Sequence, residues 1–238
     1  MCFQTHQEKM PGTDSLFILI PVYNDATTIN SVITELFSAG YKNVVVIDDG
    51  STQDVRGSIT GTCVHYLKHH INLGQGAALQ TGIDYALNQG AKIIVTFDAD
   101  GQHDASDIKA LSFCITNDLA DVALGSRFLE RSRSGVRFRR LIILELARLV
   151  NFIFSGLYLS DAHNGLRAFN HKAATSLTIT ENRMAHASEI LFQIKQHRLR
   201  HREIPVNVRY SAYSMGKGQS GWNSIRILLD IIIYKISN

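Results

Sequence analysis

Three short apolar runs in the first hundred residues each end in polar side chains, and this pattern constrains the fold more than any other feature. The runs cover residues 16–22, 43–47 and 93–97. Strands that are apolar along their whole length are typical of a parallel sheet covered on both faces. Between the runs, apolar residues recur at helical spacing in 29–37 and 79–87. This alternation predicts an α/β fold with a doubly wound, mostly parallel central sheet flanked by helices.

Elsewhere in the chain, similar patterns predict three more strands and one more helix. The strands are expected at 64–67, 122–125 and 203–210, and the helix from 182 to 199. Proline has no backbone N–H to donate, so Pro205 confines the last of these strands to the edge of the sheet.

The run at 93–97 is followed by two carboxylates one residue apart, Asp98 and Asp100. Alternate residues of a strand point the same way, so these side chains are expected to lie side by side where the strand reaches the surface. Adjacent carboxylates repel each other unless a cation lies between them. A divalent ion such as Mg²⁺ suits this position because it takes most of its ligands from water and substrate phosphates. The alternative is a strand-ending turn capped by aspartates.

Polar residues and glycines follow several of the expected strands. In a doubly wound sheet, ligands bind beyond the carboxyl ends of the strands, so these residues are expected to share one edge. They are Tyr23, Asn24, Asp25, Asp48, Asp49, Gly74, Gly76, Asp98 and Asp100. Their convergence favours a site for a metal and a nucleotide over a set of solvated loops.

The glycines at 74 and 76 do not belong to a dinucleotide or triphosphate motif. Gly74-Gln75-Gly76 lacks the third glycine of the dinucleotide fingerprint, and Leu79 stands in its place. Two interpretations remain open, a helix start that needs flexible residues and a close approach of the backbone to a bound base or sugar.

Composition and charge exclude several classes of protein. A chain of 238 residues, 45% of them hydrophobic, has enough apolar material for one large domain. The net charge of +3 is too small to indicate nucleic-acid binding. Residues 1–14 are polar and lack the apolar segment of a secretory signal, so we expect none, and no apolar run reaches the roughly 18 to 20 residues that a membrane span needs. The three cysteines match no metal-binding spacing and favour a reducing compartment.

Five short motifs occur in order along the chain. They are Pro-Val-Tyr-Asn at 21–24, Val-Ile-Asp-Asp-Gly-Ser-Thr at 46–52, Asn-Leu-Gly-Gln-Gly-Ala at 72–77, Asp-Ala-Asp-Gly-Gln-His at 98–103 and Gly-Ser-Arg at 125–127. With these motifs the chain resembles the inverting family 2 glycosyltransferases of the GT-A fold, over nearly all of 16–229. Within that family it is most similar to the polyprenyl-phosphate sugar transferases typified by dolichol-phosphate mannose synthase.

The resemblance implies a nucleotide-sugar-binding fold and a role for each matching residue. Asp98 and Asp100 match the pair that binds Mg²⁺ or Mn²⁺, with Gln102 close to the ion, and Arg127 matches an arginine that meets phosphates. Asp25 stands where Glu is more often found, which shortens its reach, and Asp48 matches the carboxylate that meets the base or ribose. The candidate nucleotide-sugar-binding residues are Pro21, Tyr23, Asp25, Asp48, Gly74, Gly76 and Asp98.

The candidate catalytic residues are Asp100, Arg127, Glu189 and Lys217. Glu189 falls where many members of the family carry an acidic base. A phosphate acceptor is already an anion, so we interpret Glu189 as positioning the acceptor or the metal, and the alternative is an acid favoured by the helix dipole. Lys217 lies in a glycine-rich segment and is expected to close over the phosphates; a solvated loop is the alternative.

Residues 161–169 resemble another element of the family, which lies near the active site. Arg167 is either a structural ion-pair partner or a direct phosphate contact. His163 either lines the pocket or is a hydrogen-bonded core residue.

Residues 128–160 form a basic and amphipathic insertion that we expect to lie at a membrane surface. Five arginines precede the very apolar stretch 141–160, in which Glu145, Arg148 and Asn151 form a narrow polar stripe. Each charge at the centre of a membrane-spanning helix costs about 2.5–3.5 kcal/mol, so the stretch is expected to lie in the interface. The alternative is a buried helix with an exposed polar edge.

We place the catalytic domain at 15–222, between a polar tail at 1–14 and a C-terminal amphipathic helix at 223–238. In many relatives transmembrane helices follow at this point. No apolar run of this sequence is long enough to span a membrane, and the stretches 141–160 and 223–238 are amphipathic. We therefore expect a cytoplasmic protein, peripherally associated with the inner face of the membrane, with a separate small membrane protein as a candidate anchor.

These expectations imply inverting, metal-dependent transfer of a hexose from a UDP- or GDP-linked sugar to polyprenyl (undecaprenyl or dolichyl) phosphate. The nearer alternative is transfer to a saccharide hydroxyl in surface-polysaccharide assembly (O-antigen or capsule), where Glu189 becomes an obligatory base. A binding module without catalysis is a second alternative, against which the intact pair Asp98 and Asp100 argues. A sugar-1-phosphate nucleotidyltransferase is disfavoured, because no glycine-rich, lysine-containing loop follows the first strand.

Overall fold

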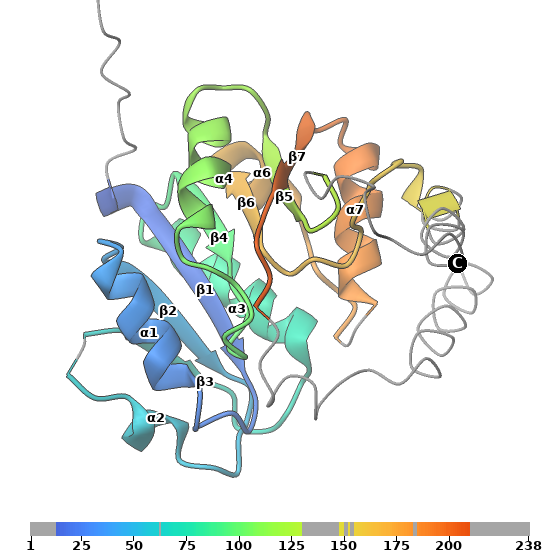
Figure 1. Cartoon of the computed structure of the whole chain (residues 1–238). Helices are drawn as coiled ribbons and strands as arrows, with labels where there is room; N and C mark the ends of the chain where they lie inside the picture. Colours follow the sequence, from blue (N-terminus) through green and yellow to red (C-terminus); the bar gives the residue numbers. More distant parts are fainter. Residues whose placement is uncertain are drawn as a thin grey trace, which may run out of the picture.

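The computed structural model describes residues 13–61, 63–129, 148, 149, 152, 155–182 and 185–209. Within these residues the chain forms one seven-stranded sheet between two layers of helices (Figure 1). The strand order is β3-β2-β1-β4-β6-β5-β7. The strands are β1 (Leu16–Val22), β2 (Asn43–Asp48), β3 (His65–Lys68), β4 (Ile93–Thr96), β5 (Val122–Ser126), β6 (Arg167–Asn170) and β7 (His201–Pro205).

Most neighbouring strands of this sheet are parallel, as predicted. β1 pairs in parallel with β2 and β4, β2 with β3, and β5 with β7. β6 is antiparallel to both of its neighbours, β4 and β5. It was not predicted, because its sequence Arg-Ala-Phe-Asn is short and contains no apolar run. Its direction brings Arg167 beside Thr96, at the edge of the sheet where β4 ends.

Alternate residues of β1 bury the two faces of the sheet against different helices. Ile18 and Ile20 pack in one core with α1 (Ile29–Ser38), α2 (Val55–Ser58) and α4 (Asp107–Thr116). Phe17 and Leu19 pack in the other core with α3 (Gln75–Asn88), α6 (His171–Ser176) and α7 (His186–Gln196). All seven residues of β1 are buried, which is why the strand is apolar along its whole length.

The predicted strands match β1 to β5 within one residue at each end. The last strand lies at the sheet edge as predicted, but it covers His201–Pro205 because the chain then turns along the loop after β4, where Arg209 N–H donates to Gln102 O. The helix predicted from 182 to 199 is shorter. It begins at His186 and ends at Gln196, because the φ of +52° at Arg198 cannot continue a right-handed helix.

Several predictions fall on residues outside those that the structure describes. They concern nearly all of the tail at 1–14, most of 128–160, Lys217 and the helix at 223–238. The domain boundaries at 15 and 222 therefore stay predictions. In the described part of the chain, no helix has the length and apolar character needed to cross a membrane.

Candidate active site

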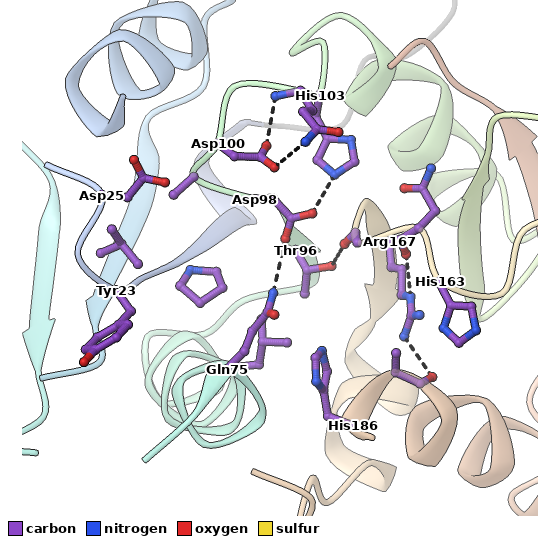
Figure 2. A pocket seen from close by; sticks show the side chains of 18 of the residues that line it. Tyr23, Asp25, Gln75, Thr96, Asp98, Asp100, His103, His163, Arg167 and His186 are labelled. Atoms are coloured by element: carbon purple, nitrogen blue, oxygen red, sulfur yellow. Dashed lines mark hydrogen bonds and ion pairs between the residues drawn. The ribbon is translucent and has the colours of Figure 1, made fainter. Parts of the chain in front are cut away.

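A cavity of about 520 Å³ opens at the edge of the sheet where β1, β4 and β5 end (Figure 2). Its walls come from the residues after these strands, the loop before α3, the segment before β6 and the start of α7. The predicted site residues that line it are Pro21, Tyr23, Asp25, Gly74, Asp98, Asp100, Gln102 and Arg127. The structure thus brings most of the predicted residues to one edge.

Asp98 lies near the centre of the cavity wall and is held from several sides. Its Oδ2 atom is 3.0 Å from Nε2 of His103, and its Oδ1 atom accepts a hydrogen bond of 3.3 Å from the side-chain amide of Gln75. A Cβ atom on Gly165 would be 2.2 Å from Asp98 Oδ2, so a larger residue at 165 would displace the carboxylate. These neighbours fix the direction in which Asp98 points.

Asp100 accepts two hydrogen bonds from Gln102, of 3.0 Å from the backbone N–H and 2.8 Å from the side-chain amide. Burial raises the pKa of Asp100, and the charges of Asp98 and Asp25 add to this effect. Burial would also raise the pKa of Asp98, but the hydrogen bond and charge of His103, together with the charges of His186 and Arg167, lower that pKa. The mutual repulsion of these carboxylates is what a bound cation would relieve.

The pair formed by Asp98 and Asp100 fits a divalent ion that takes its other ligands from water and phosphate. Mg²⁺ is commonly held by one or two carboxylates in this way. The described residues contain no group of three or more His, Cys, Asp or Glu side chains that could hold a metal ion. Asp98 and Asp100 are therefore the residues of this wall that would hold such an ion.

The chain after β1 forms another wall of the cavity. The Asp25 carboxylate is buried, and its Oδ1 atom accepts a hydrogen bond of 2.8 Å from the hydroxyl of Thr28. Thr28 directly precedes α1, but its hydroxyl does not cap the helix; it lies 2.8 Å from the carbonyl oxygen of Ala99 instead. These contacts tie the β1 loop to the β4 loop. Tyr23, which is 49% exposed, lines the cavity beside Asp25.

Asp49, and not Asp48, lines the cavity after β2. Asp48 is fully buried and accepts hydrogen bonds from Ser51 N–H at 2.8 Å and from the hydroxyl of Tyr66 at 2.7 Å. Asp49 accepts a hydrogen bond of 2.7 Å from Gly74 N–H. Successive strand residues point to opposite sides, so two adjacent aspartates at a strand end do not both face one cavity.

The two glycines before and within α3 allow close packing against the chain at 181–182. Gly74 has a φ of +102°, and a Cβ atom there would be 2.0 Å from the carbonyl oxygen of Asn182. A Cβ atom on Gly76 would be 1.9 Å from the carbonyl oxygen of Glu181. Close backbone packing therefore accounts for both glycines. Gly74 lines the cavity and Gly76 does not.

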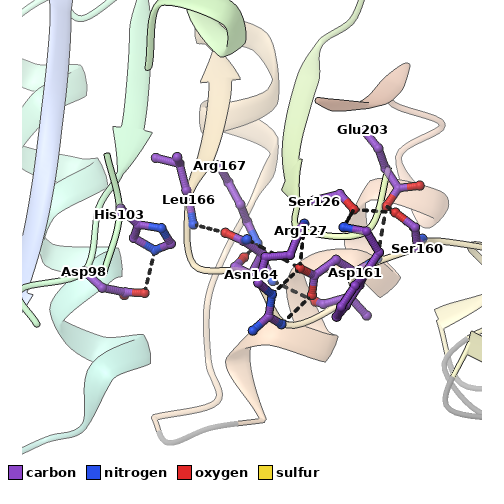
Figure 3. Close-up of polar contacts among 12 residues, drawn as sticks. Asp98, His103, Ser126, Arg127, Ser160, Asp161, Asn164, Leu166, Arg167 and Glu203 are labelled. Carbon is purple, nitrogen blue, oxygen red and sulfur yellow. Dashed lines mark hydrogen bonds and ion pairs between the residues drawn. The ribbon is translucent and has the colours of Figure 1, made fainter. Parts of the chain in front are cut away.

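Two arginines line the cavity, one directly after β5 and one at the start of β6. Arg127 follows β5 and forms a two-point ion pair with Asp161 (Figure 3). Arg167 is buried and donates hydrogen bonds of 3.0 and 3.1 Å to the carbonyl oxygens of Asn164 and Ala162. Burial lowers the pKa of Arg167 to about 10, so the guanidinium stays charged at neutral pH. The cavity therefore contains both cations and carboxylates.

Glu189 lies in the first turn of α7 and is not among the residues that line the cavity. It is buried and accepts hydrogen bonds of 3.1 and 3.0 Å from the backbone N–H groups of Thr180 and Glu181. These bonds hold the segment that packs on Gly76. The predicted role of Glu189 toward the acceptor or metal stays a prediction.

The sequence profile of the family described as Glycosyl transferase family 2 matches residues 17–178, more than half of the chain. The chain belongs to glycosyl transferase family 2. This glycosyltransferase is 33% identical to a protein of uncharacterised function from Methanocaldococcus jannaschii, over 98% of this chain and 97% of that protein. It is 29% identical to the UDP-N-acetylglucosamine–dolichyl-phosphate N-acetylglucosaminyltransferase of Methanococcus voltae, over 93% of this chain and 96% of that enzyme.

Among solved structures, the glycosyltransferase resembles glucosyl-3-phosphoglycerate synthase from Mycobacterium tuberculosis in complex with Mn²⁺, UDP and phosphoglyceric acid. The TM-score is 0.65 at 17% identity, and the match covers 91% of this chain and 78% of that one. At this identity the likeness concerns the fold, which is GT-A. The family and the fold predicted from the motifs are therefore confirmed.

Several residues of the glycosyltransferase cavity were not predicted from the sequence. They are Gln75, Thr96, His103, Asn164, Gly165 and His186, whereas Asp49 was among the residues expected at this edge. His186 opens α7 and is buried, and its charge lowers the pKa of Asp98. A single histidine at a helix start carries no signal of this placement. His163, for which two interpretations were open, lines the cavity.

Proposed function

We propose that this glycosyltransferase transfers a hexose from a nucleotide-diphosphate sugar to polyprenyl phosphate, with inversion at the anomeric carbon. The observation that carries this is the combination, in one cavity, of the carboxylates Asp98 and Asp100 with Arg127 and Arg167. Carboxylates suit a metal ion and guanidinium groups suit phosphates. The Methanococcus voltae relative, named for a UDP-sugar donor and a dolichyl-phosphate acceptor, matches nearly the whole chain and supports this choice of substrates.

Asp98 and Asp100 would hold a Mg²⁺ or Mn²⁺ ion, with Gln102 beside them. When bound, such an ion neutralises charge on the nucleoside diphosphate that leaves. His103 and Gln75 keep the Asp98 carboxylate in place for this purpose. The Mycobacterium tuberculosis neighbour, solved with Mn²⁺ and UDP, supports an ion of this kind.

The wall formed by Pro21, Tyr23 and Asp25 would bind the nucleoside, whether uridine or guanosine. Asp48 would act there indirectly. It accepts a hydrogen bond from Ser51 N–H, and the Ser51 hydroxyl accepts one of 2.9 Å from the N–H of Asn24, the residue after Tyr23. Asp48 would thereby set the position of the nucleoside wall.

In the proposed reaction, an oxygen of the polyprenyl phosphate forms a bond to the anomeric carbon on the face opposite the leaving group. The bond from that carbon to the donor phosphate breaks, and its electron pair leaves with the nucleoside diphosphate. Arg127 stabilises the phosphate charge. The acceptor is already an anion near pH 7 and needs little help from a general base, so Glu189 would support the segment 180–181 around the cavity.

Lys217 would add a further cationic side chain at the phosphates. Val208 lines the cavity, and Lys217 follows it by nine residues. Nine extended residues span at most about 30 Å, so a lysine at this distance along the chain can reach the cavity.

The lipid acceptor implies work at a membrane, and we propose peripheral attachment at its inner face, with a separate small membrane protein as a candidate anchor. Leu149, Phe152 and Tyr158 are 49%, 45% and 62% exposed, and the arginine-rich part of 128–160 precedes them in the sequence. A segment that is rich in both apolar residues and arginines suits the surface of an anionic bilayer. Co-sedimentation with anionic liposomes measures this attachment, and a protein that stays in the supernatant at every salt concentration would contradict it.

A transfer assay with UDP- and GDP-linked sugars and a short polyprenyl phosphate tests the proposed function, with the products identified by mass spectrometry. We expect a sugar-phosphate-polyprenyl product from at least one donor. Transfer to a saccharide hydroxyl, with none to the lipid phosphate, would contradict the proposed acceptor. Glu189→Gln should change transfer to a phosphate less than about 3-fold, whereas transfer to a hydroxyl that needs a base would fall about 10²- to 10⁴-fold.

A further inference from the structure

The guanidinium of Arg127 is oriented by Asp161, a carboxylate for which no role was predicted. Asp161 is 6% exposed, and its oxygens lie 2.6 Å and 2.8 Å from Nε and Nη2 of Arg127. The backbone N–H of Arg127 donates a further hydrogen bond of 3.1 Å to Asp161. A two-point contact of this kind fixes both the direction and the plane of the guanidinium. The Arg127 side chain is nevertheless 32% exposed and lines the cavity.

Asp161 is anchored in turn by β7, the strand at the edge of the sheet. Glu203 of β7 accepts hydrogen bonds of 2.8 and 3.1 Å from the backbone N–H groups of Ser160 and Asp161. The Ser160 hydroxyl donates to the same Glu203 oxygen at 2.6 Å and lies 2.5 Å from the hydroxyl of Ser126. Figure 3 shows this series of contacts from Glu203 to Arg127. The edge strand therefore helps to determine where Arg127 points.

We propose that Asp161 is a positioning residue, which holds Arg127 in the orientation in which it binds a substrate phosphate, and that Glu203 holds Asp161 in place. This role depends on the phosphate-binding role of Arg127 proposed above. A long side chain loses rotamer freedom when it binds a ligand, and Asp161 has already removed much of that freedom. The ion pair also reduces the net charge that a phosphate meets. Asp161 would therefore assist transfer by orienting the Arg127 guanidinium, and not by increasing the positive charge at the site.

A second Asp–Arg pair allows positioning to be separated from a purely structural role. Asp121, just before β5, is 2% exposed and lies 3.0 Å from Nη2 of Arg200. Arg127 follows the other end of the same strand, but neither Asp121 nor Arg200 is among the residues that line the cavity. If both carboxylates served stability alone, their removal would have the same kind of effect. If Asp161 positions Arg127, its removal would also slow transfer.

The test compares Asp161→Asn with Asp121→Asn in the full chain. For each variant, kcat/KM for sugar transfer and the thermal unfolding curve are measured. We expect Asp161→Asn to lower kcat/KM about 10- to 100-fold, because small misplacements of a charged group slow a reaction by such factors. Asp121→Asn should change kcat/KM less than about 3-fold at equal concentration of folded protein, and Glu203→Gln should lower it about 3- to 10-fold.

A double-mutant cycle decides whether Asp161 acts through Arg127. In the background of Arg127→Gln, Asp161→Asn should cost less than about 3-fold, because the side chain that it positions is gone. If Asp161→Asn does not fold, Glu203→Gln is put through the same cycle.

Three results would overturn the positioning role: an equal loss in both backgrounds, a loss from Asp121→Asn as large as that from Asp161→Asn, or no loss from Arg127→Gln. A wild-type protein that transfers sugar to a hydroxyl and not to a phosphate would contradict the proposed acceptor alone. The same cycle, measured on that reaction, would still decide the role of Asp161.

Discussion

The carboxylates at the two ends of the sheet's strands, one end near the start of β5 and the other at the cavity, differ in the charges that surround them. Before β5, Asp121 accepts hydrogen bonds from Arg200 and Asn170, and those from Arg200 contribute most to lowering its pKa to about 2. After β4, Asp98 and Asp100 lie on one cavity wall, and their pKa values move in opposite directions. At the first edge the protein itself supplies the opposite charge. At the second, His103 lowers the pKa of Asp98, whereas burial and the charges of Asp98 and Asp25 raise the pKa of Asp100.

The difference suggests that the carboxylate before β5 serves stability, whereas the carboxylates after β4 serve binding. Ion pairs completed within the protein hold the chain together at one edge. A carboxylate with a raised pKa, such as that of Asp100, is a cost to the folded state that a cationic ligand can offset, and perturbed groups of this kind cluster at functional sites. The following substitutions test whether the two edges differ in this way.

The largest effect is expected from Asp98→Asn, at the cavity edge. It removes one of the two charges proposed to hold the metal ion, and transfer should fall about 10³-fold. The amide can still form hydrogen bonds with its neighbours His103 and Gln75, so the unfolding temperature should change little. Transfer is measured as the release of nucleoside diphosphate, and stability as the temperature of thermal unfolding. A variant that keeps near-wild-type turnover in the presence of a chelator would contradict the metal role.

A smaller loss is expected from Gly165→Ala, which leaves every charge in place. The new Cβ atom would be 2.2 Å from Asp98 Oδ2, so the carboxylate must move and transfer should fall about 10- to 100-fold. Gly82→Ala is the matched control, because the atoms nearest to its Cβ atom would be side-chain carbons of Ile47 and Leu19 in the core, at 2.9 to 3.3 Å. Rates for both variants are compared with that of the wild type. Equal activity of Gly165→Ala and Gly82→Ala would show that the position of Asp98 is not critical.

The smallest effect on transfer is expected from Asp121→Asn, which should lower stability. The pKa of Asp121 is about 2 in the folded protein and 3.8 ordinarily, so its contribution is present above pH 3.8 and is lost as the pH falls through 2. We expect a stability difference of about 1 to 2 kcal/mol at pH 7, because solvent screens the half-exposed Arg200. Urea unfolding of wild type and variant should show this difference shrinking towards pH 2. A difference independent of pH would contradict the ion pair.

The sequence predicted the strands and the binding edge well, for a physical reason. The runs that became β1, β2, β4 and β5 are almost wholly buried on both faces, so their apolar residues mark their ends within one residue. The shorter β3 is only partly buried. Parallel strands that end at one edge then bring Asp25, Asp98 and Arg127 together without further information.

The contacts that orient the site could not be predicted in the same way. Asp161 lies 34 residues from Arg127 and 42 from Glu203, and the three meet only because of how β6 and β7 pair with β5. β6 has no apolar run that marks it as a strand. Asp48 and Asp49 differ by one position, and a shift of one residue at a strand end decides which of them faces the cavity.

A crystal structure with Mn²⁺ and a nucleotide-diphosphate sugar would test most directly whether the carboxyl edge of the sheet binds the donor. We predict that the ion lies against Asp98 and Asp100, with the diphosphate between the ion and Arg127 and the nucleoside beside Tyr23. A donor bound outside this cavity, or a diphosphate remote from both aspartates, would contradict the proposed site.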